Sequence, residues 1–152
     1  MAISSSLKIL LDLAQQRTDT AAKELGKLNL HQQEAEKKLN LLLQYRHSYQ
    51  THFHAAMEKG AGHVEWTNFM AFMEKLDAAI SEQRLAVSLA QKKKAVGTDA
   101  FMDCQRKLKS YSTLVQRQQH QENHKQMKYE QKLQDEFALN ATHRGPPPHR
   151  EE

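Results

Sequence analysis

The chain has 152 residues, of which 39% are hydrophobic and only 7% aromatic, and it carries a net charge of +4. It contains five glycines, and its three prolines form one run, Pro146 to Pro148. Such a scarcity of turn residues excludes an α/β or all-β domain. Mixed charges and abundant Gln, Lys, Leu and Ala are typical of long helices, and no proline interrupts a helix before residue 146.

Apolar residues in the first third of the chain recur at alternating steps of four and three, the spacing of a coiled coil. This pattern predicts a helix over residues 5–58. Twelve of its fifteen positions are apolar, and the full series is Leu7, Leu11, Ala14, Thr18, Ala21, Leu25, Leu28, Gln32, Ala35, Leu39, Leu42, Arg46, Tyr49, Phe53 and Ala56.

A turn follows at residues 59–63, where Gly60 and Gly62 can both adopt positive φ. The same spacing then resumes and predicts a second helix over residues 64–142. Twelve of fifteen positions are again apolar: Trp66, Phe69, Met73, Leu76, Ile80, Gln83, Val87, Ala90, Lys94, Gly97, Phe101, Cys104, Leu108, Tyr111 and Val115. We refer to the two series together as the seam.

The two series have equal length on either side of one short turn, which predicts an antiparallel hairpin. Residues whose numbers add to 122 should face each other, with small side chains opposite larger ones. The expected pairs are Ala14 with Leu108, Thr18 with Cys104, Ala21 with Phe101, Ala35 with Val87, and Ala56 with Trp66. Gly26 and Gly97 fall at nearly the same level, where Lys94 faces Leu28. These glycines are either tolerated without a role or mark a functional bend.

The apolar series ends after Val115, so residues 116 to about 140 have no partner within the chain. We expect this segment to be a frayed helical extension that a partner protein orders. The fold class is therefore all-α: a long two-helix antiparallel coiled-coil hairpin, an elongated rod with an unpaired C-terminal helical extension. Residues 1–144 form this single coiled coil, and residues 145–152 are expected to be a disordered tail.

Enzymatic chemistry finds no support in the residue patterns. His120 and His124 share a helix face, but HQENH lacks the Glu that follows the first His in zinc-binding helices, and no third ligand is evident. Glycine-rich phosphate-binding motifs are absent. Cys104 lies on the seam, where a buried small residue is expected rather than a nucleophile. We expect no catalytic residues, metal or cofactor.

The single cysteine fits a reducing compartment, and no stretch is long and apolar enough to span a membrane, so a cytoplasmic protein is expected. Residues 91–109 alone account for the net charge, with six basic residues against Asp99 and Asp103. One reading of this basic patch is nucleic-acid binding. A solvated or partner-facing surface is favoured, because no aromatic residues are interleaved with Lys92 to Lys94.

Near the turn, apolar residues extend beyond the seam on both helices and predict an exposed patch suited to binding a protein. The alternative is a wider core, closed by a third helix or by dimerisation. The first helix adds Leu41, Leu43, Tyr45 and Met57 to the patch, and the second adds Met70, Phe72 and Ala79. The patch overlaps the seam along two lines: Lys38, Leu42, Tyr45 and Tyr49 on the first helix, and Phe72, Leu76, Ala79 and Gln83 on the second.

The sequence resembles the FliJ family, the small cytoplasmic component of the bacterial flagellar type III export apparatus. The resemblance runs through residues 11–49, GHVEWTNFMAFMEKLDAAISEQR at 62–84, and DEFALNATHR at 135–144. Its distinguishing features are the pair Tyr45 and Tyr49, Trp66 after a glycine-containing turn, and the late Asp-Glu-Phe-Ala. Lys38 and Gln83 depart from what the family's binding face would lead one to expect.

The resemblance implies a non-enzymatic stalk that binds the export ATPase FliI, the export gate protein FlhA and export chaperones, peripheral to the inner membrane. The patch near the turn would bind the gate, through Leu42, Tyr45, Tyr49, Phe72, Leu76 and Ala79. The open end of the hairpin would enter the ATPase ring and promote its assembly, through Leu7, Leu11, Val115, Tyr129, Leu133 and Phe137. A general export chaperone or coiled-coil adaptor that holds unfolded substrate is the alternative.

Overall fold

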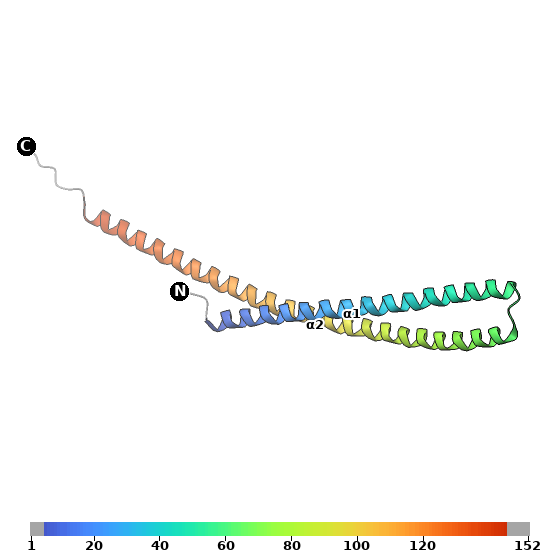
Figure 1. The fold of residues 1–152 in the computed structure, drawn as a ribbon. Coiled ribbons are helices and arrows are strands. Elements are labelled where there is room, and N and C mark those ends of the chain that lie inside the picture. The colour runs from blue at the N-terminus through green and yellow to red at the C-terminus, as the bar shows by residue number, and fades with distance from the viewer. Residues whose placement is uncertain (1–4, 146–152) are drawn as a thin grey trace, which may run out of the picture. The chain divides into compact units, whose positions relative to one another are not determined.

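The computed structural model describes residues 5–145, which form two α-helices, α1 (Ser5–Glu58) and α2 (His63–His143) (Figure 1). No strand occurs in this range. The helices pack against each other as a hairpin, so the predicted all-α fold is confirmed. Apart from Gly145, the predicted disordered tail lies outside the described residues. None of the described helices is long and apolar enough to cross a membrane.

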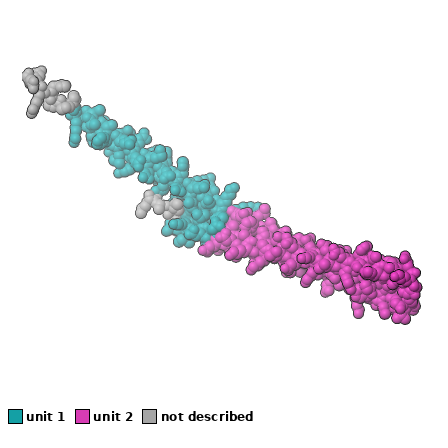
Figure 2. Space-filling view, turned by 45° about the horizontal axis from the view of Figure 1, so that its top comes forward, with its two compact units in different colours: residues 1–15, 106–152 teal, residues 16–105 magenta. Residues whose placement is uncertain are grey.

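Contacts divide the chain into two units (Figure 2). Unit 2 comprises residues 16–105 and includes the turn, whereas unit 1 comprises residues 1–15 and 106–152. Both helices contribute to both units.

Burial follows the predicted seam. Each seam position from Leu7 to Phe53 on α1 and from Phe69 to Val115 on α2 is buried or half-buried, and only Ala56 and Trp66 next to the turn are exposed. The apolar residues with the least exposure are Ala14, Ala35, Phe69, Met73, Leu76, Ile80, Val87 and Ala90. The heptad spacing therefore locates the core residues of both helices.

Contacts between the helices of unit 2 confirm the predicted pairing. The rings of Phe53 and Phe69, whose numbers add to 122, stack with centroids 3.7 Å apart. Ala35 is buried in one cluster with Val87 and Ala90. At a third level, the Thr18 hydroxyl donates a hydrogen bond to the Cys104 carbonyl oxygen at 3.3 Å. This bond satisfies a polar seam residue that is only 7% exposed.

A hydrogen-bonded cap on α1 forms the turn between the helices. Gly60 has a φ of 96°, and its N–H donates to the carbonyl of Met57 at 3.1 Å, while the Ala61 N–H donates to the Ala56 carbonyl at 3.3 Å. These two bonds make a Schellman motif, in which the residue of positive φ is most often glycine. Gly62 does not use positive φ, and its carbonyl accepts from the Trp66 N–H in the first turn of α2.

In unit 1, half-burial at seam spacing continues two steps beyond Val115, to Gln118 and Glu122. Every described residue from 123 to 145 is exposed. The segment after Val115 was expected to fray, yet α2 remains helical to His143. It contains no glycine or proline before Gly145 and is rich in Gln, Lys and Glu, whose helix propensity is high.

The two glycines within the helices have different surroundings, although both helices pass through them without interruption. A methyl group added at Gly97 would lie 2.6 Å from Leu28 Cδ1 and 3.7 Å from Leu25 Cδ1, whereas one added at Gly26 would meet nothing within 4 Å. The absence of a side chain at Gly97 therefore makes room for Leu28 of α1.

Alanine substitution should separate the two positions. Gly26→Ala should raise the free energy of unfolding by about 1 kcal/mol, because alanine has the higher helix propensity and nothing opposes its methyl group. Gly97→Ala should raise the free energy of unfolding by clearly less, because the Leu28 side chain must move to admit the added methyl group. Thermal and urea denaturation followed by circular dichroism measure both changes, and equal gains would show that the contact with Leu28 is loose.

Candidate partner-binding surfaces

Six aromatic rings form a continuous ladder across the helices next to the turn. α1 supplies its rings at intervals of four residues and α2 at intervals of three, so each set lies along one face. Centroids of neighbouring rings lie 3.7 to 6.4 Å apart. The members of this aromatic ladder are Tyr45, Tyr49 and Phe53 of α1 and Trp66, Phe69 and Phe72 of α2.

The ladder is buried in its middle and reaches the surface at both ends. Phe69 is 7% exposed and stacks on Phe53, whereas Trp66 at one end is 43% exposed and Tyr45 at the other is 54% exposed. Tyr49 and Phe72 lie between these extremes, half-buried with their centroids 4.4 Å apart. Tyr45 meets Phe72 edge to face, with centroids 6.1 Å apart. The exposed ring of Tyr45 thus packs on the rings of Tyr49 and Phe72, which also pack against the core cluster.

The six residues predicted to bind the export gate gather in this region of unit 2, at different depths. Leu76 is only 6% exposed and belongs to the core cluster with Phe69, Met73 and Ile80. Tyr45 alone is exposed. The half-buried members are Leu42, Tyr49, Phe72 and Ala79. A partner that approaches this face would therefore touch Tyr45 first, with the half-buried residues around it.

Polar contacts between the helices lie close to the same face. The Arg46 Nε donates to Asp77 Oδ1 at 2.6 Å, and this hydrogen bond, with the attraction of the carboxylate, raises the pKa of Arg46 above its ordinary value. The side-chain amide of Gln83 donates from Nε2 to the Ala35 carbonyl oxygen at 2.9 Å. Gln83 thus forms part of the contact between the helices, which accounts for a glutamine at the edge of the patch.

The residues predicted to bind the ATPase lie in unit 1 and are of two kinds. Leu7, Leu11 and Val115 are half-buried seam residues. The other three lie on α2, where Tyr129 is 64% exposed, Leu133 47% and Phe137 79%. Because these three follow one another at intervals of four residues, they share one face of the helix. Together they form an exposed apolar strip.

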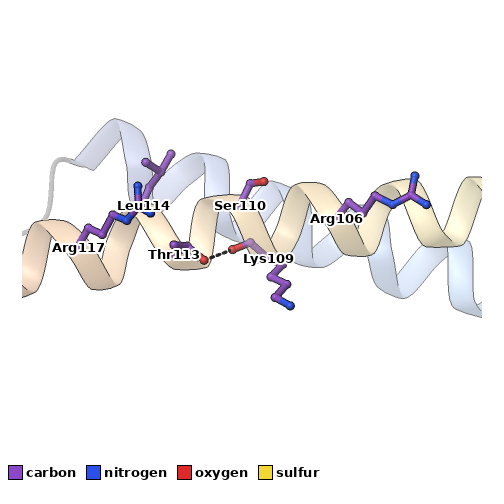
Figure 3. Close-up of a pocket in the computed structure, with 6 residues that line it drawn as sticks. All are labelled: Arg106, Lys109, Ser110, Thr113, Leu114 and Arg117. Atoms are coloured by element: carbon purple, nitrogen blue, oxygen red, sulfur yellow. Dashed lines mark hydrogen bonds between the residues drawn. The ribbon is translucent and has the colours of Figure 1, made fainter.

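Arg106, Lys109, Ser110, Thr113, Leu114 and Arg117 line a shallow hollow of about 640 Å³ in unit 1, on successive turns of α2 (Figure 3). The Thr113 hydroxyl is turned back onto its own helix, where it donates to the Lys109 carbonyl at 2.8 Å. All six residues belong to one helix and the hollow is open, so nothing there encloses a reactant.

Within residues 5–145, no three His, Cys, Asp or Glu side chains come together in a way that could hold a metal ion. Cys104 is half-buried on the seam, and its backbone carbonyl accepts the Thr18 bond. Exposed apolar side chains such as those of Tyr45 and Phe137 are suited to binding other proteins.

Comparison with known proteins identifies the family. The family model described as "Flagellar FliJ protein" matches residues 4–146. The chain belongs to the flagellar FliJ protein family. It is 30% identical over 146 residues to the flagellar FliJ protein of Salmonella typhi and 29% identical over 146 residues to that of Escherichia coli (strain K12). Both alignments cover 96% of this chain and 99% of the relative.

Family membership makes the chain a non-enzymatic component of the flagellar export apparatus. The resemblance stated from the Tyr45 and Tyr49 pair, Trp66 and the late Asp-Glu-Phe-Ala is confirmed. Sequence reasoning did not single out a further set of exposed apolar residues on α2: Leu85, Leu89 and Val96. Their spacing of four and seven residues was the signal that could have revealed them.

The hydrogen bond from Gln83 should contribute measurably to stability. Gln83→Ala removes the donor to the carbonyl of the buried Ala35 and should lower the free energy of unfolding by about 1 kcal/mol. The matched control is Gln91→Ala, because Gln91 is an exposed glutamine on the same helix. Urea denaturation measures both variants. Equal stability of the two would mean that the bond to Ala35 contributes nothing.

Proposed function

We propose that this protein is a stalk that couples the export ATPase of the flagellar apparatus to the export gate. The observation that carries the proposal is that two exposed apolar surfaces lie in different units, one in the aromatic ladder and one on α2 beyond Glu122. Apolar surfaces that stay exposed in the folded chain are suited to binding partner proteins. The partners, FlhA at the gate and the FliI ring, are those that resemblance to the family implies.

The gate is assigned to the ladder surface: Leu42, Tyr45, Tyr49, Phe72, Leu76 and Ala79. Tyrosine suits a binding hot spot, because it offers a large rigid ring and a hydroxyl that can stay hydrogen-bonded. Support for this assignment comes from the contacts beneath Tyr45, since Tyr49 and Phe72 hold its ring in place before a partner arrives. Little conformational entropy then remains to be lost on binding.

The ATPase is assigned to unit 1, through Leu7, Leu11, Val115, Tyr129, Leu133 and Phe137. The strip of Tyr129, Leu133 and Phe137 lies on a helix that is already formed, with side chains free to enter an apolar site. This favours helix-in-groove recognition, in which residues at intervals of three and four act as anchors. In this proposal the protein also binds export chaperones and works in the cytoplasm, held at the membrane through the export apparatus.

Reciprocal single substitutions test the assignment of the two surfaces. Tyr45→Ala should weaken binding to the purified cytoplasmic part of the gate protein by about tenfold or more, as expected for a hot-spot residue, and leave ATPase binding unchanged. Phe137→Ala should do the reverse. Both side chains are more than half exposed, at 54% and 79%, so neither variant should disturb the hairpin. Surface plasmon resonance against each partner measures the four affinities.

Each variant in this pair is the control for the other. A loss of both affinities in Tyr45→Ala, together with a lower melting temperature, would mean that Tyr45 acts as a core residue. Unchanged gate binding with an intact fold would rule out the ladder as the gate surface. Capture of unfolded export substrate by the ladder, without any effect on the ATPase, would favour the alternative of a general chaperone.

Removal of residues 118–152 tests the role of the C-terminal part of α2. The truncated chain should lose its stimulation of ATPase activity, because the exposed strip is gone. The melting temperature of the hairpin should stay close to that of the full chain, since Gln118 and Glu122 are the only half-buried residues among the described ones that are removed, and the others are exposed. Phosphate release by the ATPase and circular dichroism measure the two properties. Full stimulation by the truncated chain would exclude this segment from ATPase binding.

A further inference from the structure

The side of α2 that faces away from the seam carries exposed leucine and valine side chains. Leu85 is 72% exposed, Leu89 55% and Val96 69%. Intervals of four and seven residues place all three along one line of the helix. Val87 and Ala90, which are buried against α1, lie on the far side of α2 from this line. These apolar residues therefore belong neither to the core nor to the aromatic ladder.

The line extends in both directions with coiled-coil spacing, and charged residues bound its apolar centre. Every member is exposed and lies in unit 2. We name this set the outer stripe, and it consists of Lys75, Ala78, Glu82, Leu85, Leu89, Lys92, Val96 and Asp99.

We propose that the outer stripe is a self-association surface, on which the α2 helix of a second copy of this chain packs in antiparallel orientation. In such a pair around a twofold axis, each residue meets the one whose number completes a constant sum. With a sum of 174, every contact along the stripe is complementary. The pairs, each of which occurs twice, are Leu85 with Leu89, Ala78 with Val96, Glu82 with Lys92, and Lys75 with Asp99.

Charge selects this register over its neighbours. Sliding one copy by a heptad in one direction would place Lys75 against Lys92. Sliding it in the other direction would place Glu82 against Asp99 and Leu89 against Lys92. Like charges at close range and a leucine opposite an ammonium group are both unfavourable. Parallel packing in register is also disfavoured, because each charged residue would meet its own copy.

This complementarity identifies the occupant as a second copy of the chain. The stripe supplies acidic residues at two positions and basic residues at two others, so that positions equally distant from its centre carry opposite charges. An anionic membrane would attract Lys75 and Lys92 but repel Glu82 and Asp99. The self-association stands apart from the proposed coupling function, since it uses neither the ladder nor the strip at Tyr129.

The contact should be weak and reversible. The stripe spans 25 residues, with about 36 Å of helix between its first and last members, and is a single helix wide. Interfaces of this kind lie at the small end of the range and are typical of transient complexes. Dimers are therefore expected at high local concentration.

Site-directed disulfide formation tests the pairing in the full chain. Cys104→Ser removes the native thiol and retains the backbone carbonyl that accepts the Thr18 bond. In that background, a mixture of Glu82→Cys and Lys92→Cys chains should cross-link at least tenfold faster than either chain alone. Identical positions lie about 15 Å apart along the helix, whereas a disulfide needs Cα atoms within about 7 Å. The matched control is Glu82→Cys mixed with Asp99→Cys, which would be adjacent only in the shifted register.

Charge reversal tests the same contact without cysteines. Glu82→Lys and Lys92→Glu should each lower the association constant of the dimer by about fivefold or more, because each variant turns two ion pairs into pairs of like charges. The double variant should restore it. Leu85→Asp should abolish dimerisation. Sedimentation velocity over a range of protein concentrations measures all four, and circular dichroism verifies that the hairpin stays folded.

Three results would overturn the proposal. The first is a chain that remains monomeric at the highest concentration, whether or not it binds vesicles of phosphatidylcholine and phosphatidylglycerol. The second is cross-linking of the Glu82→Cys and Asp99→Cys mixture as fast as the predicted pair. The third is a double charge reversal that dimerises no better than the single variants. Gate and ATPase binding by the Leu85→Asp variant would remain intact, which keeps this test separate from that of the coupling function.

Discussion

Side-chain packing along the seam is the constraint on which the rest of this protein depends. Neither helix has another apolar surface inside the described chain to bury its seam residues against, so each relies on the other for its core. The stacked rings of Phe53 and Phe69, and the buried cluster of Ala35 with Val87 and Ala90, keep the helices in one register. With that register set, the Schellman cap at Gly60, the Thr18 bond to Cys104 and the Gln83 bond to Ala35 can all form.

The proposed gate surface is not separable from this core. Tyr49 and Phe72 contribute to the seam contacts near the turn and also hold the exposed ring of Tyr45. Substitutions at Tyr49 or Phe72 should therefore affect both the stability of the hairpin and gate binding. Substitution of Tyr45 should affect gate binding alone. On α2 beyond Glu122 the situation is simpler, because no described residue there is buried. Partner binding in that segment can change without any consequence for the seam.

The heptad spacing was sufficient to predict the hairpin and its register, because period and turn position determine which residues meet. It could not rank the exposure of Tyr45, Tyr49 and Leu76, since that depends on how far each helix is rotated about its axis and on side-chain rotamers. Nor could it show that Gln83 reaches the Ala35 carbonyl, or that Gly97 admits Leu28 whereas Gly26 faces open space. The outer stripe has the seam's own spacing but fewer apolar residues, so the seam dominates the pattern of this helix.

The position of the aromatic ladder beside the turn has a kinetic consequence. A contact between Phe53 and Phe69 closes a loop of only a few helical turns, whereas Thr18 and Cys104 are 86 residues apart in the chain. Loop closure costs more entropy as the loop lengthens, so the ladder is the natural nucleus, from which pairing proceeds like a zipper. By the same reasoning, unit 2 should open first at the levels farthest from Gly60. Its ladder should then be the last part to lose protection against hydrogen exchange.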